Sequence, residues 1–303
     1  MREALEHVIR NAILFEYALP NLEQGIEKSC ISSQNQNDIC LNNSNSQEIS
    51  KIIYNGIVEF AINEFRIDYS QLQKEQLRVI HSRIRYREDA RADVKLKYGF
   101  FGEVLLDLIL RVILGTRVLI ARGYFYSPIE KSEVKGFDAF HLMERDGKTE
   151  LWFGEAKFYE SPRKAITSVL EKIATSLSDE FLDKNLLAII TEADNISNSN
   201  DQFSSLLEAW RDNPRIALHQ EIANREMRLV YPIFIAYQKN KTDHYHKSIK
   251  SCIDHIASEC LRLKINISAS FDYRLFFIFL PLADVKQIKE TVLKWIDSQE
   301  PLI

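Results

Sequence analysis

Two carboxylates and one ammonium group lie inside apolar stretches of this sequence, where an unpaired charge is costly to bury. The segment GFDAFHLMERDGKTELWFGEAKFY, residues 136–159, carries Asp138 in its first half and Glu155 and Lys157 in its second half. Phe, Leu, Trp and Ala occupy many of the positions around them. Carboxylates of this kind can hold a hard divalent cation, and a lysine beside them can stabilise charge on a phosphate.

The dipeptide Asp146-Gly147 predicts where this segment turns. A type I′ hairpin turn needs positive φ at both central positions, and Asp-Gly is a strong signal for it. With these two residues at the tip, Asp138 falls directly opposite Glu155. A symmetric loop over Arg145–Lys148 gives the same register, whereas a three-residue loop or a bulge would break it.

Strand alternation then places the charges. Lys157 shares the face of Glu155, and Ala156 points to the other face. Like charges directly opposite one another are destabilising, and one lysine does not fully offset two carboxylates. A divalent cation offsets both carboxylates, and the Ala156 carbonyl could add an oxygen ligand. The alternative interpretation is a structural ion pair between Glu155 and Lys157, with Asp138 accepting turn-type hydrogen bonds.

Composition limits the class of protein. The chain has 303 residues, of which 46% are hydrophobic and 27% charged, which is typical of a globular protein. Its net charge of −4 excludes a globally basic nucleic-acid binder. Its four cysteines form no C-x-x-C pair, which argues against a disulfide framework. The start lacks a signal-peptide core, and the apolar runs are too short to span a bilayer, so we expect a cytoplasmic protein with no membrane contact.

Periodicity predicts an α/β fold with an N-terminal helical extension. Residues 1–29 and 51–65 have helical spacing, and the Asn/Ser/Gln-rich residues 31–47 are typical of a mobile surface loop. Residues 100–114 are apolar nearly all round and predict a buried helix. Residues 117–126 predict a strand.

The second half of the chain alternates between helix and strand. We expect a helix over residues 161–181, a strand over 186–191, a helix near Trp210 and a strand over 229–237. A helix over residues 244–264, a strand over 273–282 and a last helix to Trp295 complete the prediction, and this tail could extend the same sheet. The predicted domains are an N-terminal extension at 1–95, a core at 96–192 and an α/β continuation at 193–303.

The pattern of a buried, glutamate-bearing helix followed by D … E-x-K on paired strands resembles the PD-(D/E)XK, or restriction-endonuclease-like, nuclease superfamily. That resemblance implies a central mixed sheet flanked by helices. It implies that Asp138 and Glu155 are metal ligands and Lys157 is the catalytic lysine. Glu103 would match the superfamily's helix glutamate, which reaches toward the metal. The implied cofactor is Mg²⁺ or Mn²⁺, and position 137 is Phe rather than the motif's Pro.

A longer string of motifs resembles the HamA family, the nuclease subunits of Hachiman-type bacterial anti-phage systems, and its AbpA-like relatives. The motifs are KYGFFGEVLLDLIL, EVKGFDAFHL, LWFGEAKFY and KAI, and the likeness is good over about residues 95–175. It implies a DNA-degrading effector that acts with a superfamily 2 helicase. The alternative is a catalytically silent subunit that binds or restrains a helicase.

Four basic residues are further candidates for nucleic-acid contact. Arg83 and Arg85 alternate with apolar residues, and on a strand they would form a basic stripe for DNA phosphates. Arg163 and Lys164 open the helix that follows the site strand. In each case the alternative is an ordinary solvated charge.

Overall fold

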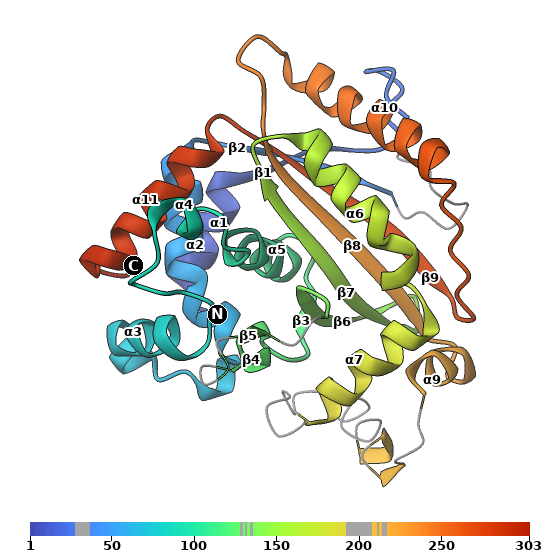
Figure 1. Cartoon of the computed structure of the whole chain (residues 1–303), viewed down its shortest axis with the longest axis horizontal. Helices are drawn as coiled ribbons and strands as arrows, with labels where there is room; N and C mark the ends of the chain where they lie inside the picture. The colour runs from blue at the N-terminus through green and yellow to red at the C-terminus, as the bar shows by residue number, and fades with distance from the viewer. Residues whose placement is uncertain are drawn as a thin grey trace.

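A curved sheet of seven strands forms the centre of the molecule, with helices on both faces (Figure 1). The computed structural model describes residues 1–27, 37–127, 130, 132–133, 136–191, 208–210, 212–213 and 217–303. The strand order is β1-β2-β9-β8-β7-β6-β3, with parallel and antiparallel neighbours. This confirms the predicted α/β class with a central mixed sheet flanked by helices.

The strands of this sheet are β1 Ile13–Ala18, β2 Ile39–Asn43, β3 Arg117–Val118, β6 Ala139–Arg145, β7 Lys148–Tyr159, β8 Arg228–Gln238 and β9 Tyr273–Leu282. A separate hairpin joins β4 Tyr126–Ser127 and β5 Ser132–Glu133. The α-helices are α1 Glu3–Ala12, α2 Ser46–Ala61, α3 Leu72–Ser82, α4 Ala92–Lys95, α5 Phe100–Val112, α6 Pro162–Ser176, α7 Asp179–Thr191, α9 Leu218–Asn224, α10 Tyr245–Leu263 and α11 Val285–Ser298. Short 3₁₀ helices are η1 Glu64–Arg66, η2 Tyr69–Gln71 and η3 Arg122–Phe125.

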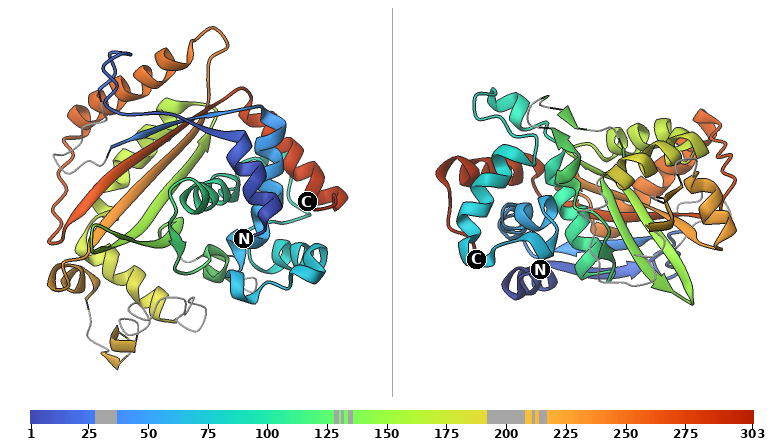
Figure 2. Two further views of the ribbon diagram at one scale, coloured as in Figure 1. Left: turned by 180° about the vertical axis from the view of Figure 1, so that it is seen from behind. Right: turned by 90° about the horizontal axis from the view of Figure 1, so that it is seen from below.

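Helices cover the central strands from both sides. Helix α5 packs on one face, where Gly102 lies against Ala156 and Phe158 of β7, and α2 packs behind α5. Helix α6 packs on the opposite face over β7 and β8, with α10 beside it. The left view of Figure 2 shows α6 behind the long strands, with α1 and α2 side by side to the right of them. Strands β8 and β9 are therefore almost completely buried, which explains their continuous apolar sequences.

Several predicted elements are confirmed. The buried helix is α5, in which all residues except Arg111 are buried. The predicted helix over residues 51–65 is α2, and the tail contributes β8, α10, β9 and α11 to the same fold. Residues 208–210 near Trp210 are also helical. Strands from all three predicted segments join the one sheet, and the boundaries between those segments remain predictions.

The N-terminal predictions are partly wrong. Residues 1–29 do not form one helix, because α1 ends at Ala12 and β1 follows from Ile13. Residues 39–43, inside the predicted loop, form β2, which pairs with both β1 and β9. The pairing with β9 joins residues more than 200 positions apart, so local composition gives no sign of it. Residues 31–36 of that predicted loop lie outside the described residues.

Two further strand predictions are corrected. Residues 186–191 belong to helix α7, and the strand beside β7 on that side is β8. Short apolar runs fit a buried helix as well as a strand, so the length of this run misled the interpretation. Residues 117–126 contain only the two-residue strand β3, followed by η3 and the start of β4. Among the described residues, no helix is long and apolar enough to cross a membrane.

Candidate functional site

The β6–β7 hairpin has the predicted turn and register. Asp146 and Gly147 have φ of 53° and 73°, and Arg145 pairs with Lys148 beside them. The ladder then runs without a slip to the pair Ala139 and Gly154. The left-handed turn geometry favoured by Asp-Gly therefore sets the position of every residue on the two strands.

The register changes at the end of the ladder, where Asp138 lies. The Asp138 backbone N–H donates to the Gly154 carbonyl at 2.7 Å, one residue out of step with the ladder. The Ala156 N–H donates to Asp138 Oδ2 at 2.9 Å, so a side chain replaces a main-chain acceptor there. The regular pairing of Asp138 with Glu155 is therefore not continued, and the Asp138 carboxylate lies beside the backbone of the E-x-K segment instead.

An aromatic anchor holds Asp138 in this place. Phe137 is buried and lies edge-on to Phe181 of α7 and Tyr231 of β8, with ring centroids 5.2 and 5.9 Å apart. Where the motif has Pro, this chain thus uses a large side chain packed into the core. That packing restrains the backbone that presents the Asp138 carboxylate.

Gly154 allows the neighbouring strand to come close to the site. A Cβ at Gly154 would lie 2.5 Å from Cγ and 2.6 Å from the carbonyl oxygen of Pro232 on β8. Pro232 has no backbone N–H, so β8 donates no ladder hydrogen bond at this point. A proline on a central strand is unusual, and it lies next to the residue that precedes Glu155.

Glu155 and Lys157 lie on one face of β7 and form an ion pair. Lys157 Nζ also lies 3.3 Å from the Ala156 carbonyl oxygen. The side chains of Glu155 and Lys157 are 20% and 13% exposed, so both charges are mostly withdrawn from water but remain reachable. Ala156 lies on the opposite face against α5, as strand alternation predicts.

The charges of this cluster are not balanced. Burial, and then the neighbouring Asp138 carboxylate, raise the pKa of Glu155 to about 7, against the opposing attraction of Lys157. Burial alone would lower the pKa of Lys157, but Glu155 and Asp138 outweigh it and raise that pKa. At neutral pH the protein therefore holds a lysine cation and a glutamate that is only partly ionised. An added cation would favour the ionised glutamate.

Glu103 is not part of a three-carboxylate cluster with Asp138 and Glu155. It belongs to α5, on the face of the sheet opposite to Glu155, and its carboxylate lies back against Gly99. Within the part of the chain that the structure describes, no group of three or more His, Cys, Asp or Glu side chains lies close enough to hold a metal. A metal role for Glu103 therefore remains a prediction.

The donors that are present fit a hard cation with few protein ligands. The Asp138 carboxylate acts on the pKa of Glu155 and accepts the N–H of Ala156, the residue directly after Glu155, whose carbonyl offers a further oxygen. Mg²⁺ commonly takes one or two protein carboxylates and keeps several waters. Among the residues that the structure describes, neither Cys nor His joins this cluster in a metal-binding group, which fits an oxygen-ligated cation better than zinc.

A comparison with protein families decides the relationship of this chain to known proteins. The HamA family model matches residues 14–296, which is nearly the whole length of the chain. The chain belongs to the HamA family. This confirms the resemblance found in the motifs of α5, β6 and β7 and extends it over the N-terminal and C-terminal parts of the chain. No curated protein matches the chain.

The other basic candidates lie in two separate places. Arg163 and Lys164 start α6, where the Lys164 N–H donates to the Ser161 hydroxyl at 3.3 Å. Arg163 lines a cavity of about 480 Å³ near the end of β8, together with Tyr237 and His255. This cavity opens on the side of the sheet toward which Glu155 and Lys157 point.

Arg83 and Arg85 do not form the basic stripe that a strand would give. Helix α3 ends at Ser82, and both arginines lie in the irregular segment after it. The Arg83 guanidinium lies over the ring of Tyr124, 4.5 Å from the centroid, whereas Arg85 is exposed. The stripe depended on extended backbone, which these residues do not adopt, and the alternative of an ordinary solvated charge fits the exposed Arg85.

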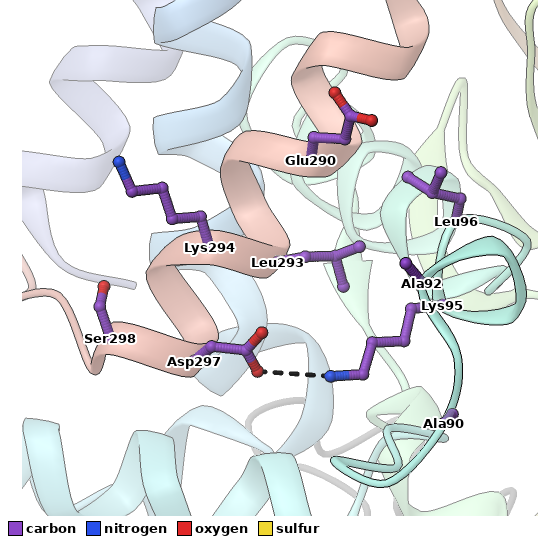
Figure 3. A pocket seen from close by; sticks show the side chains of 9 residues that line it. All are labelled: Ala90, Ala92, Lys95, Leu96, Glu290, Leu293, Lys294, Asp297 and Ser298. Atoms are coloured by element: carbon purple, nitrogen blue, oxygen red, sulfur yellow. Dashed lines mark hydrogen bonds and ion pairs between the residues drawn. The ribbon is translucent and has the colours of Figure 1, made fainter.

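A larger cavity, of about 660 Å³, lies apart from all of these residues (Figure 3). It is formed by α11 and the segment from Ala90 to Leu96. Lys95 and Asp297 face each other in it with Nζ and Oδ1 3.5 Å apart. Its charged side chains include both signs, and none of the predicted site residues lines it.

Proposed function

We propose that this chain is the Mg²⁺-dependent DNA nuclease subunit of a Hachiman-type defence system and acts with a superfamily 2 helicase. Membership of the HamA family fits a component of such a system. The observation that carries the nuclease proposal is the unbalanced cluster of Asp138, Glu155 and Lys157. A glutamate with a pKa near 7 beside a second carboxylate is arranged for a cation that the chain itself does not supply.

The order of elements also supports the proposal. Helix α5, strands β3, β6 and β7, helix α6 and strand β8 follow one another along the chain, and the four strands are adjacent in the sheet. This arrangement fits the restriction-endonuclease-like core expected from the motifs. The E-x-K segment lies on β7, between the hairpin partner β6 and the parallel strand β8.

Each side chain has a chemical role in this proposal. Asp138 and Glu155 bind the cation, with Mn²⁺ as a possible substitute for Mg²⁺, and the Ala156 carbonyl offers a further oxygen. When bound, the ion polarises a phosphoryl oxygen and lowers the pKa of water at the site. Lys157 stays protonated, so its ammonium group can stabilise the negative charge that develops on the phosphate.

Arg163 and Lys164 are the proposed phosphate contacts beside the site. They occupy the first turn of α6, directly after the strand that carries Glu155 and Lys157. The partial positive charge of a helix N-terminus would act in the same direction as their side chains.

A catalytically silent, helicase-binding subunit is the second candidate function. The position of Glu103 favours it, because the described residues do not assemble three carboxylates at the site. Such a subunit, however, has no use for a raised glutamate pKa beside Asp138 on a central strand.

A plasmid-nicking assay separates the two functions. The full chain is incubated with supercoiled DNA and Mg²⁺, alone and with a superfamily 2 helicase from a Hachiman-type system, and chelator is added in parallel. The nuclease proposal expects cleavage that needs Mg²⁺ and increases with the helicase. Stable binding to the helicase without cleavage under any of these conditions would favour the silent subunit.

A further inference from the structure

A second cationic surface lies far from β7 in the sequence. A cleft of about 610 Å³ forms where α3 meets η1 and η3. Its lining residues are Ile62, Arg66, Arg78, Ser82, Arg83 and Tyr124. Three of these six carry a positive charge, and none is Asp or Glu. In a chain with a net charge of −4, such a lining is a local reversal of sign.

The cleft has an apolar floor and a basic wall. Ile62 and Tyr124 are buried beneath it. The Arg83 guanidinium is held over the Tyr124 ring at 4.5 Å, a cation–π contact that fixes the plane of the group. Arg83 makes no ion pair with a carboxylate of the described residues. The N–H groups at the edge of its guanidinium therefore remain available for a ligand.

The other two arginines stand at the rim of the cleft. Arg66 and Arg78 are both exposed. Arg78 pairs with Glu75 of the same helix at 2.6 Å, which offsets one of the three charges. A guanidinium has five N–H donors, so a contact with one carboxylate leaves donors for a second anion.

We propose that this cleft binds backbone phosphates of the DNA, as a second contact separate from the β7 site. The inference rests on the proposed nuclease function for the identity of the nucleic acid. Planar guanidinium groups bind phosphate through paired hydrogen bonds, which suits a fixed Arg83. The three arginines come from η1, α3 and the segment after α3, and the cleft is larger than one phosphate requires. A strand with several phosphates therefore fits it better than a single small anion.

The elements that form the cleft lie in one region of the molecule. Helix α3, which supplies Arg78 and Ser82 to the cleft, lies near β4 and β5 and away from α10 (Figure 1). The segment from Tyr124 leads through β4 and β5 to Asp138. Binding in this cleft would give an acidic chain a local contact for DNA that is separate from the β7 cluster.

The test compares arginines inside and outside the cleft. Binding of the full chain to fluorescent single- and double-stranded oligonucleotides is measured by anisotropy in EDTA, so that no cleavage occurs. Arg66→Ala combined with Arg83→Ala is expected to weaken binding about tenfold and to reduce the salt slope by about one or two. Arg85→Ala, in the same segment as Arg83 but exposed and outside the cleft, is the matched control and should change affinity less than about twofold.

Two further variants guard against misfolding. Arg66→Ala removes an exposed side chain and should weaken binding even if Arg83→Ala lowers the yield of folded protein. Arg83→Lys retains the positive charge but loses the planar guanidinium with its paired N–H donors. This variant should bind DNA more weakly than the wild-type chain does. Thermal melts of every variant establish that folded proteins are compared.

The possible failures are distinct. Equal weakening by Arg85→Ala and by the cleft variants would overturn the proposal in favour of diffuse charge. It would also be overturned if the wild-type chain bound no oligonucleotide, or bound inorganic phosphate or ATP in their place. Arginine-dependent DNA binding without Mg²⁺-dependent cleavage would retain the cleft and reject the nuclease function. Mg²⁺-dependent cleavage, combined with DNA binding that the cleft variants do not weaken, would retain the nuclease function and reject the cleft.

Discussion

Two clusters in this molecule each bury a carboxylate beside a cationic group, and they differ in whether the charges are balanced. The first surrounds Asp107 of α5. His141 Nε2 lies 2.9 Å from Asp107 Oδ1, and Arg111 Nη2 lies 2.9 Å from Oδ2. Thr116 Oγ1 lies 2.8 Å from His141 Nδ1, so both ring nitrogens have partners. The charges of this closed cluster are matched by ion pairs, although the buried Arg111 Nε has no hydrogen-bond partner among the described residues.

The pKa values of this first cluster agree with its geometry. Burial would raise the pKa of Asp107, but Arg111 and His141 outweigh that effect and lower it. Burial lowers the pKa of His141, even though Asp107 acts in the opposite direction. Asp107 therefore stays ionised with its charge matched inside the fold. Such a cluster is expected to determine stability.

The second cluster, on β7, has the opposite character. Glu155 is raised to a pKa of about 7 because burial and Asp138 together outweigh the attraction of Lys157. Its side chain also keeps 20% exposure, whereas those of Asp107 and His141 keep 5% and 1%. A buried charge alone therefore does not identify a functional site. An unmatched charge that a ligand can still reach is the more informative feature.

The largest expected effect is on catalysis at the β7 cluster of Asp138, Glu155 and Lys157, which we call the open cluster. Glu155→Gln keeps the shape of the side chain and removes a metal-binding charge, and Lys157→Ala removes the ammonium group. Each should lower the rate of Mg²⁺-dependent DNA cleavage by at least about 10³-fold, because charge stabilisation at the reacting phosphate is lost. The rates of linear and nicked product formation from supercoiled plasmid measure this loss.

Matched controls come from the same hairpin. Glu144→Gln and Lys148→Ala change exposed residues near the turn and should leave the cleavage rate within about twofold. Full activity in Glu155→Gln, with the controls also active, would contradict a catalytic role for the β7 cluster.

The next largest effect is on stability at the closed cluster. Asp107→Asn removes the negative charge that Arg111 and His141 share, and Arg111 has only 9% of its side chain exposed. Breaking a buried pair in this way should cost about 3–5 kcal/mol of the free energy of unfolding. Urea unfolding followed by circular dichroism gives that value from the midpoint and slope.

An exposed ion pair supplies the comparison for Asp107. Asp93 contacts Arg91, and their side chains are 55% and 83% exposed. Asp93→Asn should cost no more than about 1 kcal/mol. If Asp107→Asn were as mild as Asp93→Asn, the closed cluster would not be a stabilising element.

The two clusters also show what the sequence could and could not predict. Asp146-Gly147 is a local signal, so it gave the turn and the register of the ladder as far as Ala139 and Gly154 correctly, but not the position of Asp138 directly opposite Glu155. The end of β9 agrees with the apolar run from Leu275 to Leu282, because both faces of that strand are buried there. The pairing of Asp107 with Arg111 joins residues one turn apart on a helix, a spacing that can be recognised from the local sequence.

Features that depend on distant partners were not predictable in this way. The contact of His141 with Asp107 joins a strand to a helix 34 residues earlier, and no local pattern indicates it. Strand β2 is rich in Asn but is ordered by β9, and the shift in hydrogen bonding at Asp138 depends on how Phe137 packs against α7 and β8. The face that α5 covers, and hence the position of Glu103, is likewise a tertiary property.

A smaller effect concerns Mg²⁺ and the stability of the open cluster. At pH 8, Glu155 is mainly ionised, so about 10 mM Mg²⁺ should raise the free energy of unfolding by about 1–2 kcal/mol if it binds with a millimolar dissociation constant. At pH 6, below the pKa of about 7, protons compete with the metal and the increase should shrink. Thermal melts at both pH values measure this without relying on cleavage.

The variants sharpen this metal test. Glu155→Gln and Asp138→Asn should lose the stabilisation by Mg²⁺, whereas Asp107→Asn should keep it despite a lower starting stability. Equal stabilisation by Mg²⁺ of the wild-type chain and Glu155→Gln would place the metal elsewhere in the molecule.

The smallest expected effect is on the metal-free protein. Glu155 has a pKa raised from 4.5 to about 7 in the folded state, so the folded state binds this proton more tightly than the unfolded state does. The associated stability is present below about pH 4.5 and is lost as the pH rises to about 7. Glu155→Gln never ionises, so in EDTA at pH 8 it should be more stable than the wild-type chain by on the order of 1 kcal/mol, and the difference should vanish near pH 4.5. Urea unfolding across this pH range tests it. A loss of about 3–5 kcal/mol in Glu155→Gln would instead mean that Glu155 and Lys157 form a structural pair like that of Asp107 and Arg111, and the distinction between the two clusters would fail.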